Sequence, residues 1–470
     1  MARLTAIVMA AGHGTRMKSS LPKVLHPACG RPLVYYPVRA ALAAGAERIV
    51  VVVNSDTRAG IEAALSNALP DVSVSYAVQK VPRGTGDAVR AGLEGLVTEA
   101  GERILILSGD TPLVEGSDLE PLVHALSSGD VLSFLAFFPD NPTGYGRVLR
   151  DESGKPTAIV EQRDLKTPER LRLGEVNAGM YAADAAHLRR ALSGLSADNA
   201  QGEYYLTDVV RDLGKSGAVS ALRVSEDAAR GVNHRGELAA AEEVMFARIR
   251  QRWAREGVSI VGRPLIDETV VLGADVQIED GVRLRGKTRI GARTRLDVGT
   301  VIDDSIFGED GWVKPYTVAR DSIVGDAVQI GPFAHLRPGS QLDAEVHVGN
   351  FVETKSTHMR RGAKANHLAY LGDGDVGEKA NVGAGTIFCN YDGFRKSRTI
   401  IGARAFIGSD SQLVAPVTIG EDAYVATGTT VTSDVPAGAL AVGRVRQENK
   451  LGYVERLRNK LRAAVPAKKS

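Results

Sequence analysis

Residues 401–425 read IGARAFIGSDSQLVAPVTIGEDAYV, in which an aliphatic residue recurs at every sixth position: Ile401, Ile407, Leu413, Ile419 and Val425. A period of six matches neither the 3.6-residue turn of an α-helix nor the two-residue alternation of a strand. It does match a triangular coil in which each hexad forms one flat side and each aliphatic residue points inward. The sequence therefore predicts stacked coils of short parallel strands in this region.

The same period extends across most of the second half of the chain. Aliphatic residues also begin hexads at Ile266, Leu272, Ile278, Leu284, Ile290, Leu296, Ile302, Val324, Ile330, Leu336, Leu342, Val348, Val376, Val382 and Val431. The fourth position after each is small or β-branched in all twenty hexads, as in the first run at Val270, Val276, Val282, Thr288, Thr294, Thr300 and Ile306. Small residues allow tight corners, and glycine after the aliphatic residue permits unusual backbone angles. We predict a hexapeptide β-helix over residues 258–443; known helices of this kind wind left-handed.

Two stretches interrupt the six-residue period, Thr354 to Asp375 and Phe388 to Ile400. A solenoid tolerates insertions at its corners, and loops held on a rigid scaffold often carry function. We therefore expect inserted loops at both places and look for chemistry among their polar residues, which are His358, Asn366, His367, Tyr370, Asn390, Tyr391, Asp392, Arg395 and Lys396.

The first half, residues 1–232, has a different organisation. Helix-sized segments separate strand-sized apolar runs at Leu4–Ala10, Arg48–Val53, Ser73–Ala77, Ile104–Leu107 and Val131–Phe137. This alternation predicts an α/β domain, a Rossmann-like sheet of parallel strands with helices on both faces. Ligands of such sheets lie at the carboxyl ends of the strands, so the residues that follow these runs are candidates for the site.

A connecting helix is predicted over residues 233–257. Its apolar residues step by three or four along the chain, and Asn233 is a plausible N-cap with Gly257 at the expected end. The last segment, residues 444–470, reads as a short basic helix followed by a disordered end from Pro466. We expect it to cover the end of the coil or to assist the capture of an anionic cofactor.

Composition excludes several classes of protein. A length of 470 residues with 44% hydrophobic content predicts two to four domains, and 58 Lys+Arg against 56 Asp+Glu is too balanced for a chain built as a whole to bind nucleic acid or lipid. The only cysteines, Cys29 and Cys389, form neither a disulfide framework nor a zinc motif. With no apolar run long enough for a membrane span, we expect a soluble cytoplasmic protein without nucleic-acid or membrane partners.

The loop after the first apolar run has the chemistry of a phosphate site. Residues 9–17 read MAAGHGTRM and residues 21–23 read LPK, so that Arg16 and Lys23 add fixed positive charge to a glycine loop whose N–H groups can hold anionic oxygens. The loop is neither a Walker loop nor a dinucleotide loop. Alone, it could be an ordinary strand-to-helix turn.

Together with other motifs, this loop resembles the signature of the sugar-1-phosphate nucleotidyltransferases. The resemblance implies that Gln79 and Gly84-Thr85-Gly86 read uracil, and that Asp110, which ends an apolar strand, holds Mg²⁺ with Asn233. It implies catalysis by charge neutralisation through Arg16 and Lys23. The implied nucleotide-sugar site comprises Met9, Ala10, Gly12, Lys23, Gln79, Gly84, Thr85, Gly144, Glu161, Asn177 and Asn233.

Motifs of the second half resemble the acetyltransferase half of a bifunctional family, the N-acetylglucosamine-1-phosphate uridyltransferase/glucosamine-1-phosphate acetyltransferases. They are the segments Arg337–Gly339, Gly349–Lys355, His367–Asp373, Asn381–Gly385 and Cys389–Gly393. By this resemblance His367 is the general base, although an isolated loop histidine would have no such role. Arg337, Lys355 and Lys396 would hold the substrate phosphate.

The resemblance also assigns the remaining residues of that site. Tyr370 and Asn381 would line the amino-sugar pocket with Asn390 and Tyr391, and the acetyl-CoA positions are Asn390, Tyr391, Ser409, Thr427 and Arg444. Thr427 stands where alanine is expected, and Ser356 and Asn366 are less typical neighbours. The family implies a homotrimer with sites between subunits, in which Tyr391 and Arg444 act across the interface.

The predicted function is therefore a bifunctional transferase. The C-terminal half would acetylate glucosamine-1-phosphate with acetyl-CoA, and the N-terminal half would transfer uridylyl from UTP to the product, giving UDP-GlcNAc for bacterial envelope polysaccharide. One alternative is a single-activity nucleoside-diphosphate-sugar pyrophosphorylase with a structural or regulatory β-helix. Another is a non-enzymatic assembly subunit, like exchange-factor subunits of translation. The polar residues around His367 argue against the first alternative, and Arg16, Lys23, Asp110 and Asn233 argue against the second.

Overall fold

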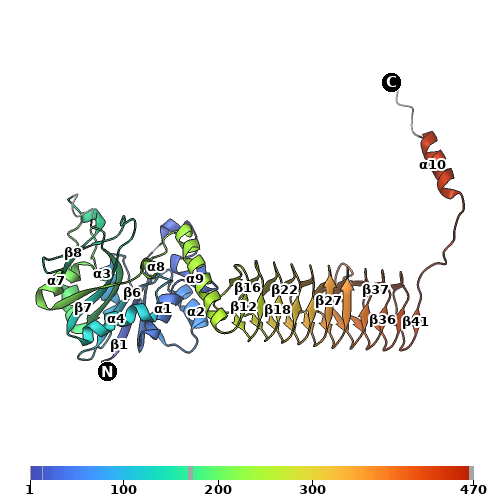
Figure 1. The fold of residues 1–470 in the computed structure, drawn as a ribbon, viewed down its shortest axis with the longest axis horizontal. Coiled ribbons are helices and arrows are strands. Elements are labelled where there is room, and N and C mark those ends of the chain that lie inside the picture. The colour runs from blue at the N-terminus through green and yellow to red at the C-terminus, as the bar shows by residue number, and fades with distance from the viewer. Residues whose placement is uncertain (1, 13, 168–172, 465–470) are drawn as a thin grey trace, which may run out of the picture. The chain divides into compact units, whose positions relative to one another are not determined.

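The computed structural model describes residues 2–12, 14–167 and 173–464 (Figure 1). The chain divides into two compact units, residues 1–253 with 266–269 and residues 254–265 with 270–470. The first unit is a sheet with flanking helices, and the second is a coil of short strands. Across the described ranges, no helix has the length and apolar character that a membrane crossing requires.

The central sheet of the first unit has the strand order β11-β7-β10-β6-β1-β4-β5, with the β8–β9 hairpin paired at its side. The bounds are β1 Leu4–Met9, β4 Arg48–Val53, β5 Val74–Val78, β6 Arg103–Ser108, β7 Asp130–Phe137, β8 Arg147–Arg150, β9 Pro156–Val160, β10 Val176–Asp184 and β11 Ala218–Arg223; β2 Pro27–Ala28 and β3 Arg31–Pro32 form a separate hairpin. Each of the five predicted apolar runs lies in a strand.

Along the main path of the sheet, from β11 to β5, one strand departs from the predicted parallel arrangement. β10 is antiparallel to both β6 and β7. Its first residue, Val176, pairs with Phe137, the last residue of β7, so the chain re-enters the sheet at the end where β7 leaves it. The segment between them contains the β8–β9 hairpin in place of the crossover helix that a parallel connection needs. The sheet is therefore mixed.

Helices lie between and after these strands, and several of them pack on the sheet and bury its apolar side chains. They are α1 Tyr35–Ala43, α2 Arg58–Ala68, α3 Thr85–Leu93, α4 Gly116–Ser127, α6 Ala185–Ser193, α7 Asp208–Ser216, α8 Glu226–Ala229 and α9 Arg235–Arg255, with 3-10 turns η1 Thr15–Met17, η2 Lys23–Leu25 and η3 Gln162–Asp164. One continuous core joins β1, β6 and β7 to α3, α6 and α7 through residues such as Ile7, Ile106 and Leu188. This packing holds the carboxyl ends of β1 and β6 rigidly side by side.

The connecting helix α9 occupies the predicted stretch, and its buried residues are those that the apolar spacing indicates: Leu238, Ala241, Met245, Ile249 and Trp253. The expected N-cap is wrong, however. The backbone N–H of Glu237 in the first turn donates to the ring Nδ1 of His234 at 3.2 Å, whereas the side chain of Asn233 accepts hydrogen bonds from cationic residues of the first unit. Asn233 therefore serves the polar cluster described below.

The second unit is a left-handed parallel β-helix of three sheets, each named here by its first strand. The β12 sheet comprises β12 Ser259–Ile260, β15 Gln277–Ile278, β18 Arg295–Leu296, β21 Trp312–Val313, β24 Gln329–Ile330, β27 His347–Asn350, β30 Lys364–His367, β33 Asn381–Val382, β36 Phe406–Ile407, β39 Tyr424–Val425 and β41 Leu440–Ala441. The β13 sheet comprises β13 Leu265–Ile266, β16 Arg283–Arg285, β19 Val301–Asp303, β22 Val318–Arg320, β25 His335–Leu336, β28 Glu353–Lys355, β31 Tyr370–Gly372, β34 Ile387–Cys389, β37 Gln412–Val414 and β40 Thr430–Val431. The β14 sheet comprises β14 Val271–Leu272, β17 Arg289–Ile290, β20 Ile306–Phe307, β23 Ile323–Val324, β26 Gln341–Leu342, β29 His358–Met359, β32 Gly374–Val376, β35 Thr399–Ile401 and β38 Val417–Ile419.

All twenty aliphatic residues that the six-residue period predicts to point inward are buried, none of them more than 7% exposed. The prediction fails at one corner position. Ile306 is 47% exposed, and Ser305 is buried in its place while Phe307 fills the next inward position. The side between Ile302 and Phe307 is one residue shorter than the six-residue period, which shifts the pattern.

The first expected loop is also absent. Between Thr354 and Asp375 the coil continues through β28 to β32 without an insertion, and Met359, Ala365 and Leu371 occupy inward, buried positions. Two shortened sides, Thr354 to Met359 and Leu371 to Val376, break the six-residue register there. The second expected loop is confirmed, because β34 ends at Cys389 and β35 begins at Thr399.

The C-terminal segment contains the predicted basic helix, α10 Tyr453–Ala464, and none of its side chains is buried. The expectation that it covers the end of the coil finds no support in that exposure. The predicted disordered end from Pro466 lies outside the described residues.

Candidate functional site

The first polar cluster lies at the carboxyl ends of β1 and β6. The Lys23 ammonium donates to Oδ2 of Asp110 and, at 3.3 Å, to Oδ1 of Asn233. Arg16 donates from Nη2 to the same Asn233 oxygen at 2.8 Å. The hydroxyl of Ser108 donates to Oδ1 of Asp110 at 2.7 Å. The structure thus brings together the four residues that sequence comparison assigned to catalysis and metal binding.

Backbone contacts fix this cluster. The N–H of Val232 donates to the carbonyl of Asp110 at 2.8 Å, and the N–H of Asn233 donates to Oε2 of Glu237 at 2.6 Å. Gly14 has φ +60° and packs directly on the Cβ of Lys23, leaving no room for a side chain of its own. These contacts hold the Asp110 and Asn233 oxygens in place although more than a hundred residues separate them.

The donor set suits a hard divalent cation. Oxygens of Asp110 and Asn233 converge on one positive charge, the Lys23 ammonium, so the site already stabilises a cation between them. Among the described residues there is no cluster of three or more His, Cys, Asp or Glu side chains that could hold a metal. A metal here would therefore take most of its ligands from water and phosphate, as Mg²⁺ in nucleotide sites does.

A pocket of about 290 Å³ opens beside this cluster. Gln79, which is only 6% exposed, donates from Nε2 to the carbonyl of Gly84 at 3.2 Å and to Oδ2 of Asp87 at 3.0 Å. The predicted residues that line the pocket are Met9, Ala10, Gly12, Lys23, Gln79, Gly84, Thr85 and Asp110. Ser108 and Glu203 also line it, and neither was singled out from the sequence.

The predicted sugar-binding residues lie outside that pocket, around β8 to β10. Glu161 accepts a hydrogen bond from Thr207 at 3.2 Å, and burial, reinforced by nearby carboxylates, raises the pKa of Glu161. Asn177 donates to the Tyr181 hydroxyl at 2.6 Å and accepts from the N–H of Gly179 at 3.0 Å. The N–H of Gly144 donates to the side chain of Gln162. These groups offer a half-buried surface of amide and carboxyl functions.

A second polar cluster lies on the β13 sheet of the β-helix. Asp373 accepts a hydrogen bond from Nδ2 of Asn390 at 2.5 Å and faces the Lys355 ammonium at 3.7 Å. Gly372 leaves space between the Tyr370 hydroxyl and the Asn390 amide, because a Cβ there would lie 2.5 and 2.7 Å from them. The Lys355 ammonium beside Lys396 lowers the pKa of Lys396.

Arg337 joins the same face one coil away. Its Nη1 donates to Oε1 of Glu353 at 2.8 Å, and β25, β28 and β31 are consecutive neighbours in the sheet. Three predicted phosphate-binding cations, Arg337, Lys355 and Lys396, are thus grouped with Tyr370 and Asn390. The carboxylates that hold them, Glu353 and Asp373, were not singled out from the sequence.

His367 lies at the edge between the β12 and β13 sheets and is exposed, at the end of β30 where it pairs in register with Asn350. Ser409 and Thr427 occupy the same edge on later coils. Backbone hydrogen bonds link the edge from coil to coil: Gly385 N–H to Leu368 O at 3.0 Å, Asp410 N–H to Ala384 O at 2.7 Å, and Gly428 N–H to Ser409 O at 2.9 Å. The Arg444 guanidinium donates to the carbonyl of Thr427.

His367, Ser409 and Thr427 form a row along this edge that spans several coils. Coils are spaced by about 4.8 Å, so His367 and Thr427, three coils apart, are separated by roughly 14 Å along the edge. Three of the predicted acetyl-CoA residues therefore follow His367 in one exposed line, as an extended ligand would require.

One predicted residue, Asn381, is not joined to these groups within the described residues, whereas Tyr391 follows Asn390 and pairs through its backbone with Lys396. Asn381 lies in β33 of the β12 sheet, and no hydrogen bond or ion pair of the described residues connects its side chain to the cluster of Tyr370 and Asn390. Tyr391 is 61% exposed at the start of the loop Asn390–Arg398, where its hydroxyl donates to the carbonyl of Gly393 at 2.6 Å.

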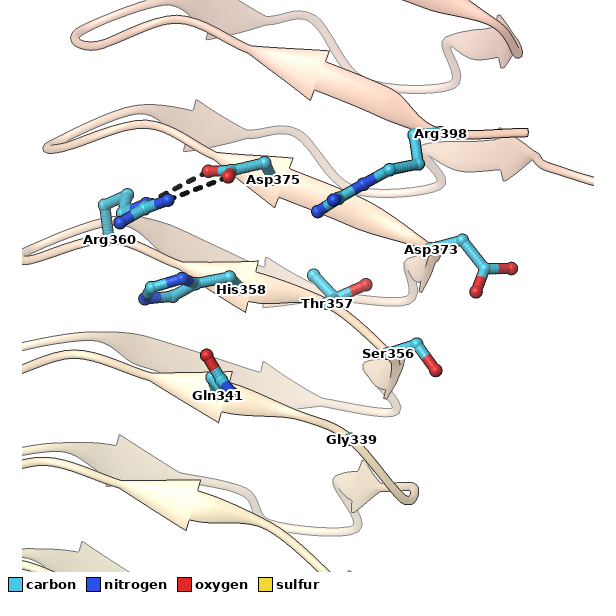
Figure 2. A pocket seen from close by; sticks show the side chains of 9 residues that line it. All are labelled: Gly339, Gln341, Ser356, Thr357, His358, Arg360, Asp373, Asp375 and Arg398. Atoms are coloured by element: carbon cyan, nitrogen blue, oxygen red, sulfur yellow. Dashed lines mark hydrogen bonds and ion pairs between the residues drawn. The ribbon is translucent and has the colours of Figure 1, made fainter. Parts of the chain in front are cut away.

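A second hollow, of about 500 Å³, lies on the β14 sheet (Figure 2). His358 lines it and pairs with Asp343 at 2.8 Å, while Arg360 forms a two-point ion pair with Asp375. Figure 2 shows Ser356 and Asp373 at the rim, pointing away from these residues. His358, one of the polar residues expected to carry chemistry, is thus held by a hydrogen bond with Asp343 on a separate face.

Comparisons with known proteins agree with this arrangement. The family model for nucleotidyl transferases matches residues 5–285, and the model for bacterial transferase hexapeptide (six repeats) matches residues 398–433. The bifunctional protein GlmU of Sorangium cellulosum is 56% identical over 467 residues, covering 98% of each chain. Those of Anaeromyxobacter dehalogenans strain 2CP-1 (51%; 96% of this chain, 92% of the relative) and Geobacter sulfurreducens (44%; 98% and 100%) are also similar over nearly the whole length.

Proposed function

Because this chain belongs to the family of bifunctional GlmU proteins, we propose that it catalyses two group transfers in UDP-GlcNAc biosynthesis. The β-helix acetylates glucosamine-1-phosphate from acetyl-CoA, and the α/β unit transfers uridylyl from UTP to the resulting GlcNAc-1-phosphate. The observation that carries the proposal is the presence of two separate polar sites, the Lys23–Asp110–Asn233 cluster and the row and cluster around His367.

In uridylyl transfer, a phosphate oxygen of GlcNAc-1-phosphate attacks the α-phosphorus of UTP, and the bond to pyrophosphate breaks. Arg16 and Lys23 neutralise the charge that develops on the transferring phosphoryl group, which is the main contribution available to a site without a covalent nucleophile. Gln79 and the backbone of Gly84 and Thr85 hold the uracil edge. Glu161 and Asn177 bind sugar hydroxyl and N-acetyl groups.

Asp110 and Asn233 are the residues that would hold Mg²⁺. When bound, the ion would orient the nucleotide phosphates and neutralise their charge. Lys23 would add positive charge for the same phosphates, since its ammonium faces the same two oxygens.

In acetyl transfer, the amine of glucosamine-1-phosphate attacks the thioester carbonyl carbon and the carbon–sulfur bond breaks. His367 takes the amine proton, and the coenzyme A sulfur leaves with the bonding electron pair. Arg337, Lys355 and Lys396 bind the sugar phosphate, while Asn390, Tyr391, Ser409, Thr427 and Arg444 hold acetyl-CoA along the edge. Arg444 supplies a fixed charge for the cofactor phosphates.

The active assembly is a homotrimer with acetyltransferase sites between subunits. The separation of Asn381 from the Tyr370 cluster supports this, because a neighbouring subunit can bring such a residue to the same substrate. Tyr391, at 61% exposure, is open to contact with another subunit. The enzyme acts in the cytoplasm, where its product is a precursor of envelope polysaccharide.

Two assays on one preparation test the proposal: thiol release from acetyl-CoA with glucosamine-1-phosphate, and pyrophosphate release from UTP with GlcNAc-1-phosphate. His367→Ala should lower the rate of thiol release by a factor of about 10²–10⁴, because the residue accepts the amine proton in acetyl transfer. It should leave pyrophosphate release unchanged, because the residue has no part in uridylyl transfer. Asp110→Ala should do the reverse. His358→Ala, a change in a histidine paired with Asp343 on another face, is the matched control and should change neither rate.

Full thiol release by His367→Ala would overturn the assignment of the base. Absence of thiol release from the unmodified enzyme, with pyrophosphate release intact, would show a single-activity pyrophosphorylase with a structural β-helix.

A further inference from the structure

The helix α10 has a face that no described part of the chain covers. Tyr453, Val454, Leu457 and Leu461 fall within an arc of about 100° on a helical projection. All four are 40–57% exposed, and none of the helix's residues is buried. A twelve-residue helix with an open apolar face gains little stability alone, so the face is expected to have a partner.

The charges around this face restrict the partner. Arg456 and Lys460 border the apolar arc on one side and Arg458 borders it on the other, with Arg462 further round and a single carboxylate, Glu455. The segment from 444 to the end holds nine Lys or Arg and two Glu. Like charges of this density repel a second copy of the same helix and favour an anionic surface.

Two anionic surfaces differ in what they do with the apolar face. A nucleic acid would contact the cations and leave Leu457 and Leu461 in water, whereas a lipid bilayer takes up both. Basic residues beside the apolar stripe can extend their charged ends to the lipid headgroups while their stems remain apolar. The combination of stripe and flanking cations therefore favours a bilayer.

The segment before α10 is an irregular linker that separates the helix from the last coil. Residues 442–452 contain no helix or strand, and Val445 and Leu451 are 93% and 90% exposed. Extended, these residues span at most roughly 40 Å. The helix can therefore lie on a surface without displacing the last coil, although Arg444 remains near Thr427.

From these observations we propose that α10 is a membrane-surface helix that binds the full-length enzyme reversibly to bilayers containing anionic phospholipid. This departs from the expectation, drawn from the balanced charge of the whole chain, that no membrane is involved. The charge that matters is local to the tail. Binding by one short helix is weak, and several tails in one assembly would strengthen it by avidity.

Co-sedimentation of the full-length enzyme with vesicles tests the proposal. Vesicles of phosphatidylcholine mixed equally with phosphatidylglycerol should bind it at least about tenfold more tightly than phosphatidylcholine alone, and added salt should weaken the binding. Leu457→Gln/Leu461→Gln keeps every charge and should lower the affinity at least about tenfold. Asn459→Gln, on the polar face, is the matched control and should bind like the unmodified enzyme.

Both activities should be unchanged in all three proteins, which shows that each is folded. If the double glutamine variant binds vesicles as tightly as the unmodified enzyme, binding is electrostatic adhesion alone and the proposal is wrong. If no protein binds vesicles and the double variant binds an oligonucleotide as tightly as the unmodified enzyme, the partner is a nucleic acid and the proposal is wrong. If no vesicles bind and removal of residues 451–470 changes the oligomeric state, the partner is another copy of the chain and the proposal is wrong.

Discussion

Gly84 gives the sharpest test of the nucleotide site, because an added methyl group there has a defined collision. The residue has φ +103° and ψ 177°, a conformation essentially restricted to glycine, and a Cβ would lie 2.6 Å from the carbonyl oxygen of Tyr204. Forcing alanine into that backbone conformation costs about 1–3 kcal/mol. The carbonyl oxygen of Tyr204 belongs to the backbone and cannot turn aside as a flexible side chain would. The loop must therefore move by about 0.7 Å before the added Cβ and this oxygen reach an ordinary carbon–oxygen contact.

That movement affects the substrate through Gln79, whose amide is held by the carbonyl of Gly84. A misplacement of about 1 Å can lower an enzymatic rate by about 10²-fold. Gly84→Ala should therefore lower kcat/KM for pyrophosphate release by about that factor and leave thiol release unchanged, since the β-helix is a separate unit.

The matched control is Gly101→Ala, which also has a positive φ, +75°, but has nothing within 4 Å of an added Cβ. It should lose about 1–2 kcal/mol of stability and no pyrophosphate-release rate. If Gly84→Ala performs within about threefold of Gly101→Ala, the close approach at Tyr204 does not position the nucleotide site and the reasoning fails.

Two further predictions concern protonation. Burial raises the pKa of Glu161, so over a range of pH the folded chain binds a proton that the unfolded chain releases. This proton binding stabilises the folded chain at acidic pH. The stabilisation is lost as pH rises from the ordinary carboxyl range through the pKa of the folded state. Glu161→Gln cannot lose a proton, so its urea midpoint should rise relative to that of the unmodified chain as the pH is raised from acidic to neutral. A difference in midpoint that stays constant with pH would contradict this prediction. In the β-helix, Lys355→Met should raise the pKa of Lys396 by removing the adjacent ammonium, which NMR titration of the Lys396 side chain would follow. An unchanged pKa would show that the two groups do not interact.

Local patterns were sufficient to predict most of the fold. Five apolar runs lie in strands, and every aliphatic residue of the twenty hexads is buried, because hydrophobic periodicity acts over a few residues and leaves a direct trace in the sequence. The direction of β10 left no such trace. It depends on where the chain re-enters the sheet after the β8–β9 hairpin, which is a property of the connection.

The candidate sites were predictable to a different extent. Residues inside recognisable motifs, such as Lys23, Asp110 and His367, could be named from the sequence. Glu353 and Asp373 also lie inside recognised segments, but no role could be assigned to them. Each is one carboxylate among 56 acidic residues, and its role arises only when a neighbouring coil places Arg337 or Lys355 against it. Asn233, which the motif assigns to metal binding, lies beside Arg16 and Lys23, while its expected helix-capping role failed because His234 lies nearer the first turn.

The errors in the β-helix have a common origin. Each shortened side, such as Ile302 to Phe307 and Thr354 to Met359, connects the β13 sheet to the β14 sheet, and the inserted loop after Cys389 makes the same connection. The edge between these two sheets therefore absorbs every change in spacing. The ladders continue in register because each strand pairs with the strand one coil away, whatever the length of the corner between them.

Chemistry gathers next to this adjustable edge. Shortened sides place Ser356 and Asp373 at tight corners with φ +46° and +51°, and Asp373 there meets Lys355 and Asn390. The opposite requirement holds at the edge that carries His367, Ser409 and Thr427, where backbone hydrogen bonds connect successive coils regularly. The regular edge therefore offers evenly spaced contacts along its length, whereas the adjustable edge offers a local cluster of charged side chains. The solenoid provides both because its departures from the six-residue period are confined to one of its three edges.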